Sequence, residues 1–342
     1  MSYSLSKRGI GHASRLVAVH SVLRDLGWRS LFLVERQQQL IADYGFDQVS
    51  VPHYDDCLVG EAPIGIGGPS GRGARVAARI VAACAEPDDV IEPDDVILHD
   101  VVVYRPLYEW ARDAGRRQAY ISRARKDHGD PVRWLREIAP GITKIFQLGT
   151  GEVPDVIRQP LGSKSIWNDA GGVIRVAISA AGGGHADAEA FLEAALGGVA
   201  GFARDAGREV AVFVVLGPNF TGRMTLPPGI PGKVSITHYL DPWHSLYQGT
   251  DLLVCQGGYN TVQELLHHGT AAVTVAGSRP FDDQSARLAA IVAQANVRIA
   301  EPSAASIAEH LRALAAAPRR GVVQANPPDG ARYIAEALTN WD

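Results

Sequence analysis

A glycine-rich segment near the amino terminus carries a histidine in a position suited to acid–base chemistry. The residues Lys7-Arg8-Gly9-Ile10-Gly11-His12-Ala13-Ser14-Arg15 follow an expected strand and open an expected helix. Glycines permit a tight turn, and the start of a helix offers N–H groups to an anion or polar ligand. Because an imidazole titrates near neutrality, His12 is a candidate general base, with helix capping or phosphate binding as alternatives. Asp100, at the end of another expected strand, either orients His12 or an acceptor or caps a helix.

Two further glycine-rich segments have the features of anion sites. Gly182-Gly183-Gly184-His185 and Gln256-Gly257-Gly258-Tyr259-Asn260-Thr261 each follow an expected strand and precede an expected helix. Backbone N–H groups and the positive end of a helix suit a diphosphate. His185 fits a phosphate contact or a helix cap equally well. Neither segment ends in Gly-Lys-Ser/Thr, so a loop that hydrolyses ATP with bound Mg²⁺ is not supported.

Carboxylate and amide side chains follow the third segment. We expect a helix to start at the Asn260-Thr261 capping position, and Glu264, three residues after Thr261, then has the spacing of a capping box. Its alternative role is to accept hydrogen bonds from ribose hydroxyls. Asp283 and Gln284 fit either an N-cap with a polar neighbour or a pair that binds sugar hydroxyls.

The sequence gives no indication of a resident metal or cofactor. No cluster of His, Cys, Asp and Glu has metal-ligand spacing. The first glycine-rich segment lacks the full Gly-x-Gly-x-x-Gly dinucleotide fingerprint, so a dinucleotide site is a weak alternative. We therefore expect no metal and no bound cofactor.

Composition and charge exclude several classes of protein. The 342 residues include 33 Lys and Arg against 37 Asp and Glu, a formal net charge of −4, so a nucleic acid recognised through a broad basic field is not expected. The 46% hydrophobic content allows a sizeable buried core. Neither a transmembrane run nor a secretory signal is visible. Since the cysteines Cys57, Cys84 and Cys255 stand far apart, we expect a reducing, cytoplasmic compartment.

Short apolar runs alternate with helical periodicity in two successive series, which is typical of an α/β protein with parallel sheets. The first series predicts strands at 3–6, 30–35, 47–52, 95–100, 117–122 and 143–148, and helices at 13–26, 71–84 and 106–114. The second predicts strands at 174–180, 210–216, 234–238, 252–255, 271–275 and 297–300, and helices at 186–205, 261–268, 284–294 and 303–316. Ligands in such sheets bind beyond the carboxyl ends of the strands, where the glycine-rich segments lie.

The two series predict two domains with a connection between them. We expect an amino-terminal domain at 1–150, a linker at 151–172, a second domain at 173–325, and a helical tail at 326–342. The linker is indicated by its turn-forming residues and its lack of sustained periodicity.

The order Gln256–Glu264 followed by Asp283-Gln284 resembles the donor-binding half of GT-B glycosyltransferases, in the MurG-like and UDP-glycosyltransferase groups. The resemblance implies two Rossmann-like domains facing a central cleft, with the acceptor bound by the domain at 1–150 and the nucleotide-sugar by the domain at 173–325. It also implies that the tail helix at 326–342 returns to the first domain. It assigns the donor diphosphate to Gly257, Gly258, Asn260 and Thr261, the ribose to Glu264, the sugar to Asp283 and Gln284, and the nucleobase region to Tyr239, Leu240 and Asp241. Gln256 departs from the pattern, because UDP-glycosyltransferases often place a phosphate-contacting histidine there.

The segment Gly9-Ile10-Gly11-His12 resembles the MurG-like glycine-rich loop, whose histidine is regarded as the acceptor base. Continued to Arg15, it is also similar to the Gly-x-Gly-His-x-x-Arg start of nucleotide-sugar hydrolases of the same fold. The segment Gly182–His185 departs from the MurG pattern Gly-Gly-Ser-x-Gly.

The function that this resemblance implies is the inverting, metal-independent transfer of a sugar from a nucleotide-diphosphate donor, such as a UDP-sugar, to a small-molecule hydroxyl. The alternatives are hydrolysis of the donor by water or a catalytically silent nucleotide-sugar-binding subunit; an epimerase shares the architecture, but no acidic pair is assignable to it. The loops 51–72 and 122–133 should shape the acceptor site but carry no transferable motif. Abundant alanine and arginine with only five lysines favour a bacterial source and a natural-product or envelope-sugar acceptor.

Overall fold

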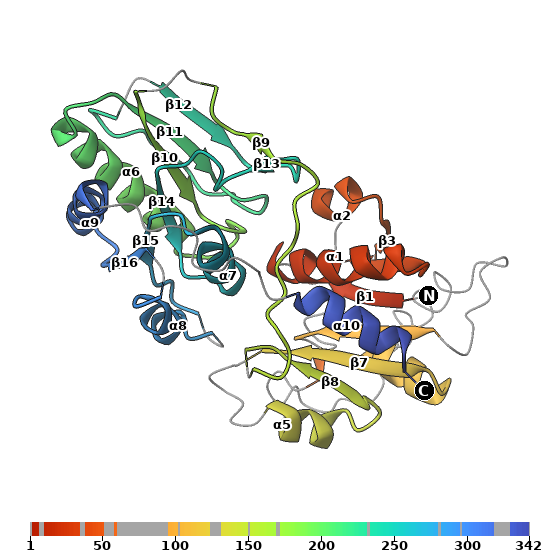
Figure 1. The fold of residues 1–342 in the computed structure, drawn as a ribbon. Helices are drawn as coiled ribbons and strands as arrows, with labels where there is room; N and C mark the ends of the chain where they lie inside the picture. Colours follow the sequence, from red (N-terminus) through yellow and green to blue (C-terminus); the bar gives the residue numbers. More distant parts are fainter. Residues whose placement is uncertain are drawn as a thin grey trace. The chain divides into compact units, whose positions relative to one another are not determined.

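The computed structural model describes most of the chain, namely residues 2–6, 10–34, 38–50, 58–59, 95–101, 103–123, 131–149, 151–168, 172–230, 233–279, 282–294, 296–317 and 329–341. The chain divides into two compact units (Figure 1). Unit 1 comprises Met1–Arg158 and Pro328–Asp342, and unit 2 comprises Gln159–Pro327. The division lies inside the stretch 151–172, and the expected helix 71–84 falls outside the described residues.

Unit 1 is built on a parallel sheet of six strands in the order β3-β2-β1-β5-β7-β8. The direction of winding changes between β1 and β5, and such a switch point is where open α/β sheets bind ligands. The strands are β1 (Ser2–Ser6), β2 (Ser30–Val34), β3 (Asp47–Ser50), β5 (Val96–Asp100), β7 (Arg117–Ser122) and β8 (Lys144–Gln147). A short antiparallel pair, β4 (Leu58–Val59) with β6 (Val103–Tyr104), accompanies the sheet.

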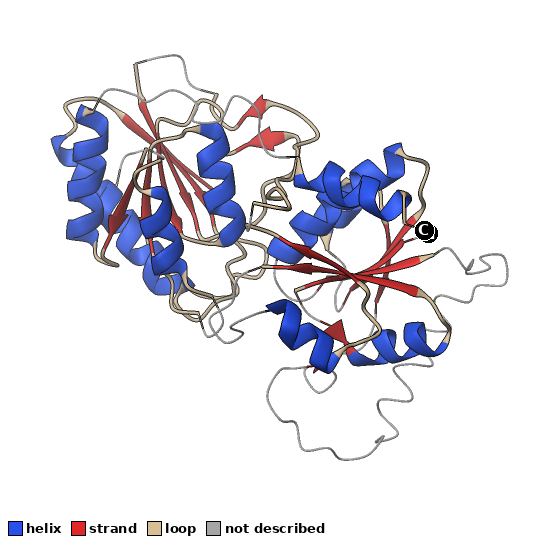
Figure 2. Ribbon diagram, turned by 60° about the horizontal axis from the view of Figure 1, so that its bottom comes forward, coloured by secondary structure: helices blue, strands red, loops and turns tan. Residues whose placement is uncertain are grey.

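Helices cover both faces of the unit 1 sheet (Figure 2). They are α1 (Ile10–Asp25), α2 (Gln39–Asp43), α4 (Arg105–Asp113), α5 (Pro131–Ile138) and α10 (Gly330–Thr339). The last of these packs on α1 and begins where the N–H of Gly330 donates to the carbonyl of Asp155 at 3.2 Å. Asp329 caps α10 by accepting from the N–H of Arg332 at 2.9 Å.

Unit 2 repeats the same topology with a parallel sheet in the order β12-β11-β10-β14-β15-β16. Its switch point lies between β10 and β14. The strands are β10 (Ile174–Ser179), β11 (Val210–Val215), β12 (Lys233–Thr237), β14 (Leu252–Gln256), β15 (Ala272–Val275) and β16 (Val297–Ala300). A second small sheet pairs β9 (Lys164–Ser165) with β13 (His244–Ser245).

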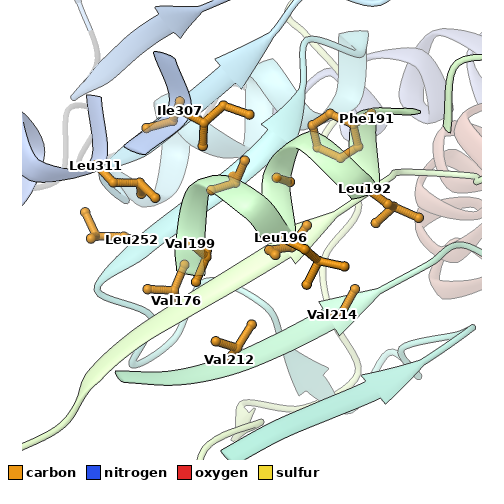
Figure 3. Close-up of a cluster of buried hydrophobic side chains, with 14 of the residues drawn as sticks. Val176, Phe191, Leu192, Leu196, Val199, Val212, Val214, Leu252, Ile307 and Leu311 are labelled. Carbon is orange, nitrogen blue, oxygen red and sulfur yellow. The ribbon is translucent and has the colours of Figure 1, made fainter. Parts of the chain in front are cut away.

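Both faces of the unit 2 sheet are covered by a hydrophobic core. Successive residues of a strand point to opposite faces of the sheet, so neighbouring residues join different cores. Val176 and Val254 join the core formed with α6 (Ala188–Asp205) and α9 (Ala304–Ala316), part of which Figure 3 shows. Ala177 and Cys255, one residue further along each strand, join the opposite core formed with α7 (Tyr259–His268) and α8 (Gln284–Ile291). The uninterrupted apolar runs of these strands therefore reflect two-sided burial.

The structure confirms every strand predicted for the two sheets, with bounds that differ by at most two residues. Two described helices, α2 and α5, were not predicted, because five and eight residues are too short for a periodic pattern to stand out. Within the described part of the chain, no helix combines the length and apolar character needed to span a bilayer.

Candidate functional site

In unit 1, His12 and Asp100 lie in contact beside the switch point. His12 is in the first turn of α1, and Asp100 is the last residue of β5. Nδ1 of His12 lies 2.8 Å from Oδ2 of Asp100 and 3.1 Å from its backbone oxygen. Both oxygens accept, so Nδ1 donates and Nε2 is the ring nitrogen that keeps a lone pair. The His12 side chain is 18% exposed, whereas the Asp100 carboxylate is fully buried.

Arg15, one helical turn after His12, holds the same carboxylate from a second side. Its Nε donates to Oδ1 of Asp100 at 3.0 Å and its Nη2 donates to Oδ2 at 2.8 Å, a bidentate arrangement. Burial alone would raise the pKa of Asp100, but the charge of Arg15 and the hydrogen bond from His12 lower it to about 2. Asp100 is therefore ionised at physiological pH.

The backbone takes an unusual conformation directly after Asp100. Val101 has a φ of +62°, in the left-handed region that a β-branched residue rarely adopts. Its N–H donates to the carbonyl of Ile121 at 2.9 Å, and the hydroxyl of Tyr120 donates to its carbonyl at 2.7 Å. Conformations of this kind cost about 1–3 kcal/mol and persist where the surrounding structure imposes them. Strand β7 thus fixes the turn that carries Asp100.

In unit 2, the turn between β14 and α7 presents the first turn of a helix at the switch point. The helix begins at Tyr259 with Gly258 as its N-cap and without a side-chain cap, and the N–H of Val262 bonds to the carbonyl of Gly258 at 3.0 Å. The expected start at Asn260 or Thr261 is therefore wrong, because the extended backbone of Gly258 lets the helix begin earlier. Asn260 and Thr261 are first-turn residues, where N–H groups lie outside the helical ladder and at the positive end of the dipole.

Glu264 is engaged differently from a capping-box residue. Its Oε2 accepts a hydrogen bond from the hydroxyl of Tyr247 at 2.5 Å. The Tyr247 ring stacks on His268, with ring centroids 4.5 Å apart and planes inclined by 12°. Burial, with a contribution from the charge of Glu264, raises the pKa of Cys255 to about 12. The capping-box interpretation is wrong, and the partly buried carboxylate is held by an aromatic hydroxyl.

Two arginines that follow β15 contact the segments that follow β10 and β14. Arg279 places Nη1 at 2.9 and 2.8 Å from the two carboxylate oxygens of Asp187, the N-cap residue of α6. Arg287 donates through Nη1 to the carbonyl of Gly257 at 3.1 Å, and its guanidinium lies 5.5 Å from the ring centroid of Tyr259. These contacts connect the segments after β10, β14 and β15 in one network.

The segment Gly182–His185 forms the turn between β10 and α6. Gly183 has a φ of +72°, and a Cβ added there would lie 2.3 Å from the carbonyl oxygen of Leu216, so only glycine fits. The N–H of Asn219 donates to the carbonyl of Gly182 at 3.0 Å. Gly184 and His185 are exposed, and the N-cap of α6 is Asp187, so the interpretation of His185 as the helix cap is wrong.

Asp283 and Gln284 have structural partners within unit 2. Oδ1 of Asp283 accepts from the N–H of Ala286 at 3.0 Å and caps α8, while Oε1 of the buried Gln284 accepts from the N–H of Gly277 at 2.8 Å. Their binding of a sugar remains a prediction.

The residues expected beside the nucleobase, Tyr239 and Leu240, are partly buried and follow β12. The hydroxyl of Thr237 donates to the carbonyl of Tyr239 at 2.7 Å. In the described ranges, no group of three or more His, Cys, Asp and Glu side chains is arranged to hold a metal ion.

Residues 182–322 match the sequence model of the glycosyltransferase family 28 C-terminal domain. This match covers the glycine-rich segments after β10 and β14 and the pair Asp283-Gln284. The chain therefore contains a glycosyltransferase family 28 C-terminal domain. A search of curated protein sequences finds no significant match for this chain.

Solved structures show the same fold, the GT-B fold, over nearly the whole chain. SnogD from Streptomyces nogalater is 17% identical, with a TM-score of 0.60 over 98% of this chain and 99% of that one. MurG from Acinetobacter baumannii is 15% identical, with a TM-score of 0.59 over 99% of both chains. A UDP-N-acetylglucosamine 2-epimerase from Listeria monocytogenes, described as putative in its structure report, is 10% identical, with a TM-score of 0.61 over 99% of this chain and 94% of that one. Since proteins named for both chemistries share this fold, the assignment of unit 2 rests on the family 28 domain.

Sequence reasoning did not assign the contacts of three residues: Arg15, which it placed only in a motif, in unit 1, and Arg279 and Tyr247 in unit 2. Arg15 stands three residues after His12, a spacing that places both on one helical face and was a usable signal. Arg279 and Tyr247 gave no signal, because each meets its partner across a separation of more than 15 residues.

Proposed function

We propose that the protein transfers a sugar from a nucleotide-diphosphate-sugar donor to a hydroxyl group of a small-molecule acceptor, with inversion at the anomeric carbon. The observation that carries the proposal is the 2.8 Å contact between Nδ1 of His12 and Oδ2 of Asp100, because it leaves Nε2 to accept a proton. The family 28 domain supports a nucleotide-sugar donor.

In the proposed reaction, His12 is the proton acceptor. Nε2 of His12 takes the proton of the acceptor hydroxyl while the hydroxyl oxygen forms a bond to the anomeric carbon. The bond between that carbon and the donor phosphate oxygen breaks on the opposite face, and the nucleoside diphosphate leaves with the electron pair. Asp100, ionised and bonded to Nδ1, stabilises the imidazolium that results.

The negative charge of the leaving diphosphate requires electrostatic stabilisation. We assign this role to the first turn of α7, from Tyr259 to Thr261, and to the turn Gly182–Gly184, both at carboxyl ends of central strands. Fixed N–H dipoles and a helix end stabilise such charge without reorganisation, so the proposal requires neither a metal nor a cofactor. Gly11 and His185 complete the phosphate-side residues of the proposal.

The donor's other groups are assigned to side chains of unit 2. Glu264 binds the ribose, Asp283 and Gln284 bind the sugar, and Tyr239 and Leu240 border the nucleobase, while Gln256 lies beside the diphosphate. Structural neighbours such as SnogD from Streptomyces nogalater and a spinosyn forosaminyltransferase support a small natural-product acceptor in a bacterial cytoplasm.

Nucleotide binding is the first test. UDP, GDP, ADP, dTDP and CDP are added separately at equal concentration, and the melting temperature is measured. A ligand at 100 times its dissociation constant stabilises the native state by about 2.7 kcal/mol, so a selective nucleotide gives a clear shift. The shift should disappear in Glu264→Ala, and stabilisation by none of the five would contradict the donor site.

Transfer is tested with the sugar nucleotide that this screen selects. His12→Ala should lower turnover by about 10²–10⁴-fold while leaving nucleotide binding unchanged, and His310→Ala on α9 is the matched control. Turnover that requires an acceptor supports transfer. Donor breakdown at the same rate without acceptor identifies a hydrolase, which the motif from Gly9 to Arg15 also resembles.

A further inference from the structure

Arg15 forms a buried, bidentate ion pair with Asp100, the carboxylate that also contacts His12. The guanidinium and carboxylate meet through two hydrogen bonds of 3.0 and 2.8 Å, and both side chains are almost inaccessible, at 3% and 0% exposure. His12 contacts the same oxygen, Oδ2, that accepts from Nη2 of Arg15. One carboxylate is therefore shared between a permanent cation and a titratable imidazole.

A buried carboxylate next to an imidazole has two opposite effects on the imidazole as a general base. It orients the ring and stabilises the imidazolium formed during the reaction, but it also favours the imidazolium before the reaction starts. A histidine that is already protonated cannot accept the proton of a hydroxyl group. A general base needs a proton affinity matched to the working pH. A positive charge that partly offsets the charge of the carboxylate favours the neutral imidazole.

We propose that Arg15 is a positioning residue that keeps His12 unprotonated at neutral pH by sharing the Asp100 carboxylate. This inference rests on the proposed function of His12 as acceptor base. Arg15 sits on the same face of α1 as His12, three residues later, so one helix delivers both groups to the end of β5. The low pKa of Asp100, about 2, is consistent with two donors acting on one carboxylate.

Other titratable groups on α1 and on the elements packed against α1 and β5 bond to different partners. His20 bonds to Ser30, Arg24 to the carbonyl of Tyr44, and Asp43 to Gln39. Further bonds join His99 to Gln118, Arg117 to the carbonyl of Trp341, Tyr120 to the carbonyl of Val101, and Arg332 to Asp329 and Glu336. The other titratable residues of these elements with described side chains are Asp25, Tyr104 and Tyr333. Among the described side chains, the ionisable groups in direct contact with Asp100 are Arg15 and His12.

The test is a titration of His12 by NMR, which needs no turnover. Imidazole signals of the full chain are followed from pH 5 to 9, and His12→Ala assigns the His12 signal. Arg15→Gln keeps a donor for Asp100 but removes the charge, so the His12 midpoint should rise by about one pH unit or more. Arg15→Lys keeps the charge, and its midpoint should stay near that of the wild type. Equal midpoints in Arg15→Gln and wild type, or equal shifts in both variants, would overturn the proposal.

Loss of a buried cation leaves an uncompensated carboxylate and is expected to destabilise unit 1. The double variant Arg15→Gln with Asp100→Asn removes both charges, so its His12 midpoint should return to the wild-type value or below it. A midpoint that stays as high as in Arg15→Gln contradicts the role of the shared carboxylate. If Arg15→Gln does not fold, a midpoint of the double variant above that of the wild type contradicts the proposal as well.

The pH profile of turnover separates a charge effect from a purely structural one. In Arg15→Gln, the acidic limb of kcat/KM should move to higher pH, with about a tenfold loss at neutral pH that is recovered in alkaline buffer. A structural role would lower kcat/KM equally at every pH. If the His12 midpoint shifts as expected but His12→Ala retains full turnover, the charge-sharing inference stands and the assignment of His12 as base fails.

Discussion

Arg279 donates through Nη2 to Oε1 of Gln256 at 3.0 Å, so the segment after β15 is tied to the last residue of the neighbouring strand β14. Gln256 is 2% exposed, and the arginine satisfies an amide oxygen that burial would otherwise leave without a partner. The same guanidinium reaches Asp187, at the start of α6. One side chain from the segment after β15 therefore holds both the end of β14 and the start of α6.

Replacing Arg279 should destabilise unit 2. Arg279→Ala leaves Gln256 and Asp187 without this donor, and an unsatisfied buried polar group costs about 1–3 kcal/mol. We expect a clear fall in the denaturant midpoint, measured by the fluorescence of Trp167 and Trp243 with the other tryptophans replaced. Arg332→Ala, an exposed arginine paired with Asp329, is the control, since such pairs contribute about 0–1 kcal/mol. Equal midpoints for the two variants would contradict the role of Arg279.

Tyr247 should support nucleotide binding through Glu264. Tyr247→Phe removes the hydroxyl that lies 2.5 Å from Oε2 of Glu264 and keeps the ring that stacks on His268. If Glu264 binds the ribose, losing this hydrogen bond should weaken nucleotide binding about tenfold, as measured by calorimetry. Tyr333→Phe, on the exposed side of α10, should have no effect. Wild-type affinity in Tyr247→Phe would show that the hydroxyl does not position the carboxylate for binding.

The hydroxyl of Tyr120 should stabilise unit 1 by holding the carbonyl of Val101. Tyr120 is 2% exposed and donates to that carbonyl at 2.7 Å, next to a residue in a left-handed conformation. Tyr120→Phe should therefore lower the free energy of unfolding by about 1–3 kcal/mol. It should also reduce turnover more than nucleotide affinity, because Val101 follows Asp100. Thermal unfolding and steady-state kinetics measure the two effects, and unchanged values for both would exclude the role.

Acid should destabilise unit 1 through a buried histidine. Burial lowers the pKa of His20 from 6.5 to about 3, so the unfolded chain binds a proton at a pH where the folded chain does not. The stability is complete above pH 6.5 and falls progressively as the pH drops towards 3, with a loss of about 2 kcal/mol at pH 5. His20→Gln should show a smaller decline in melting temperature between pH 7 and 5 than the wild type. His310→Gln should decline as the wild type does, and identical slopes for all three would refute the assignment.

The strands could be predicted from the sequence because two-sided burial leaves continuous apolar runs such as Leu252–Cys255. The start of α7 could not, since the polar residues Asn260 and Thr261 fit a cap in sequence while the backbone of Gly258 takes that position. The contact of Asp100 with His12 was among the roles predicted for Asp100, because both residues follow strands at the carboxyl edge of the expected sheet. The partners of Gln256 and Glu264 depend on packing between distant segments, which local patterns do not encode.

The helix α10 belongs to unit 1 although the whole of unit 2 precedes it in the chain. It packs on α1 and buries Ile334 and Leu338, so unit 1 lacks part of its core until α10 has been synthesised. During translation, unit 2 leaves the ribosome before that core is complete, and the side of α1 that α10 covers is exposed to other nascent chains in the meantime. Folding of unit 1 is thus a late, long-range event. Ribosome pausing or premature termination before α10 would release chains with an exposed apolar surface on the unit that carries His12.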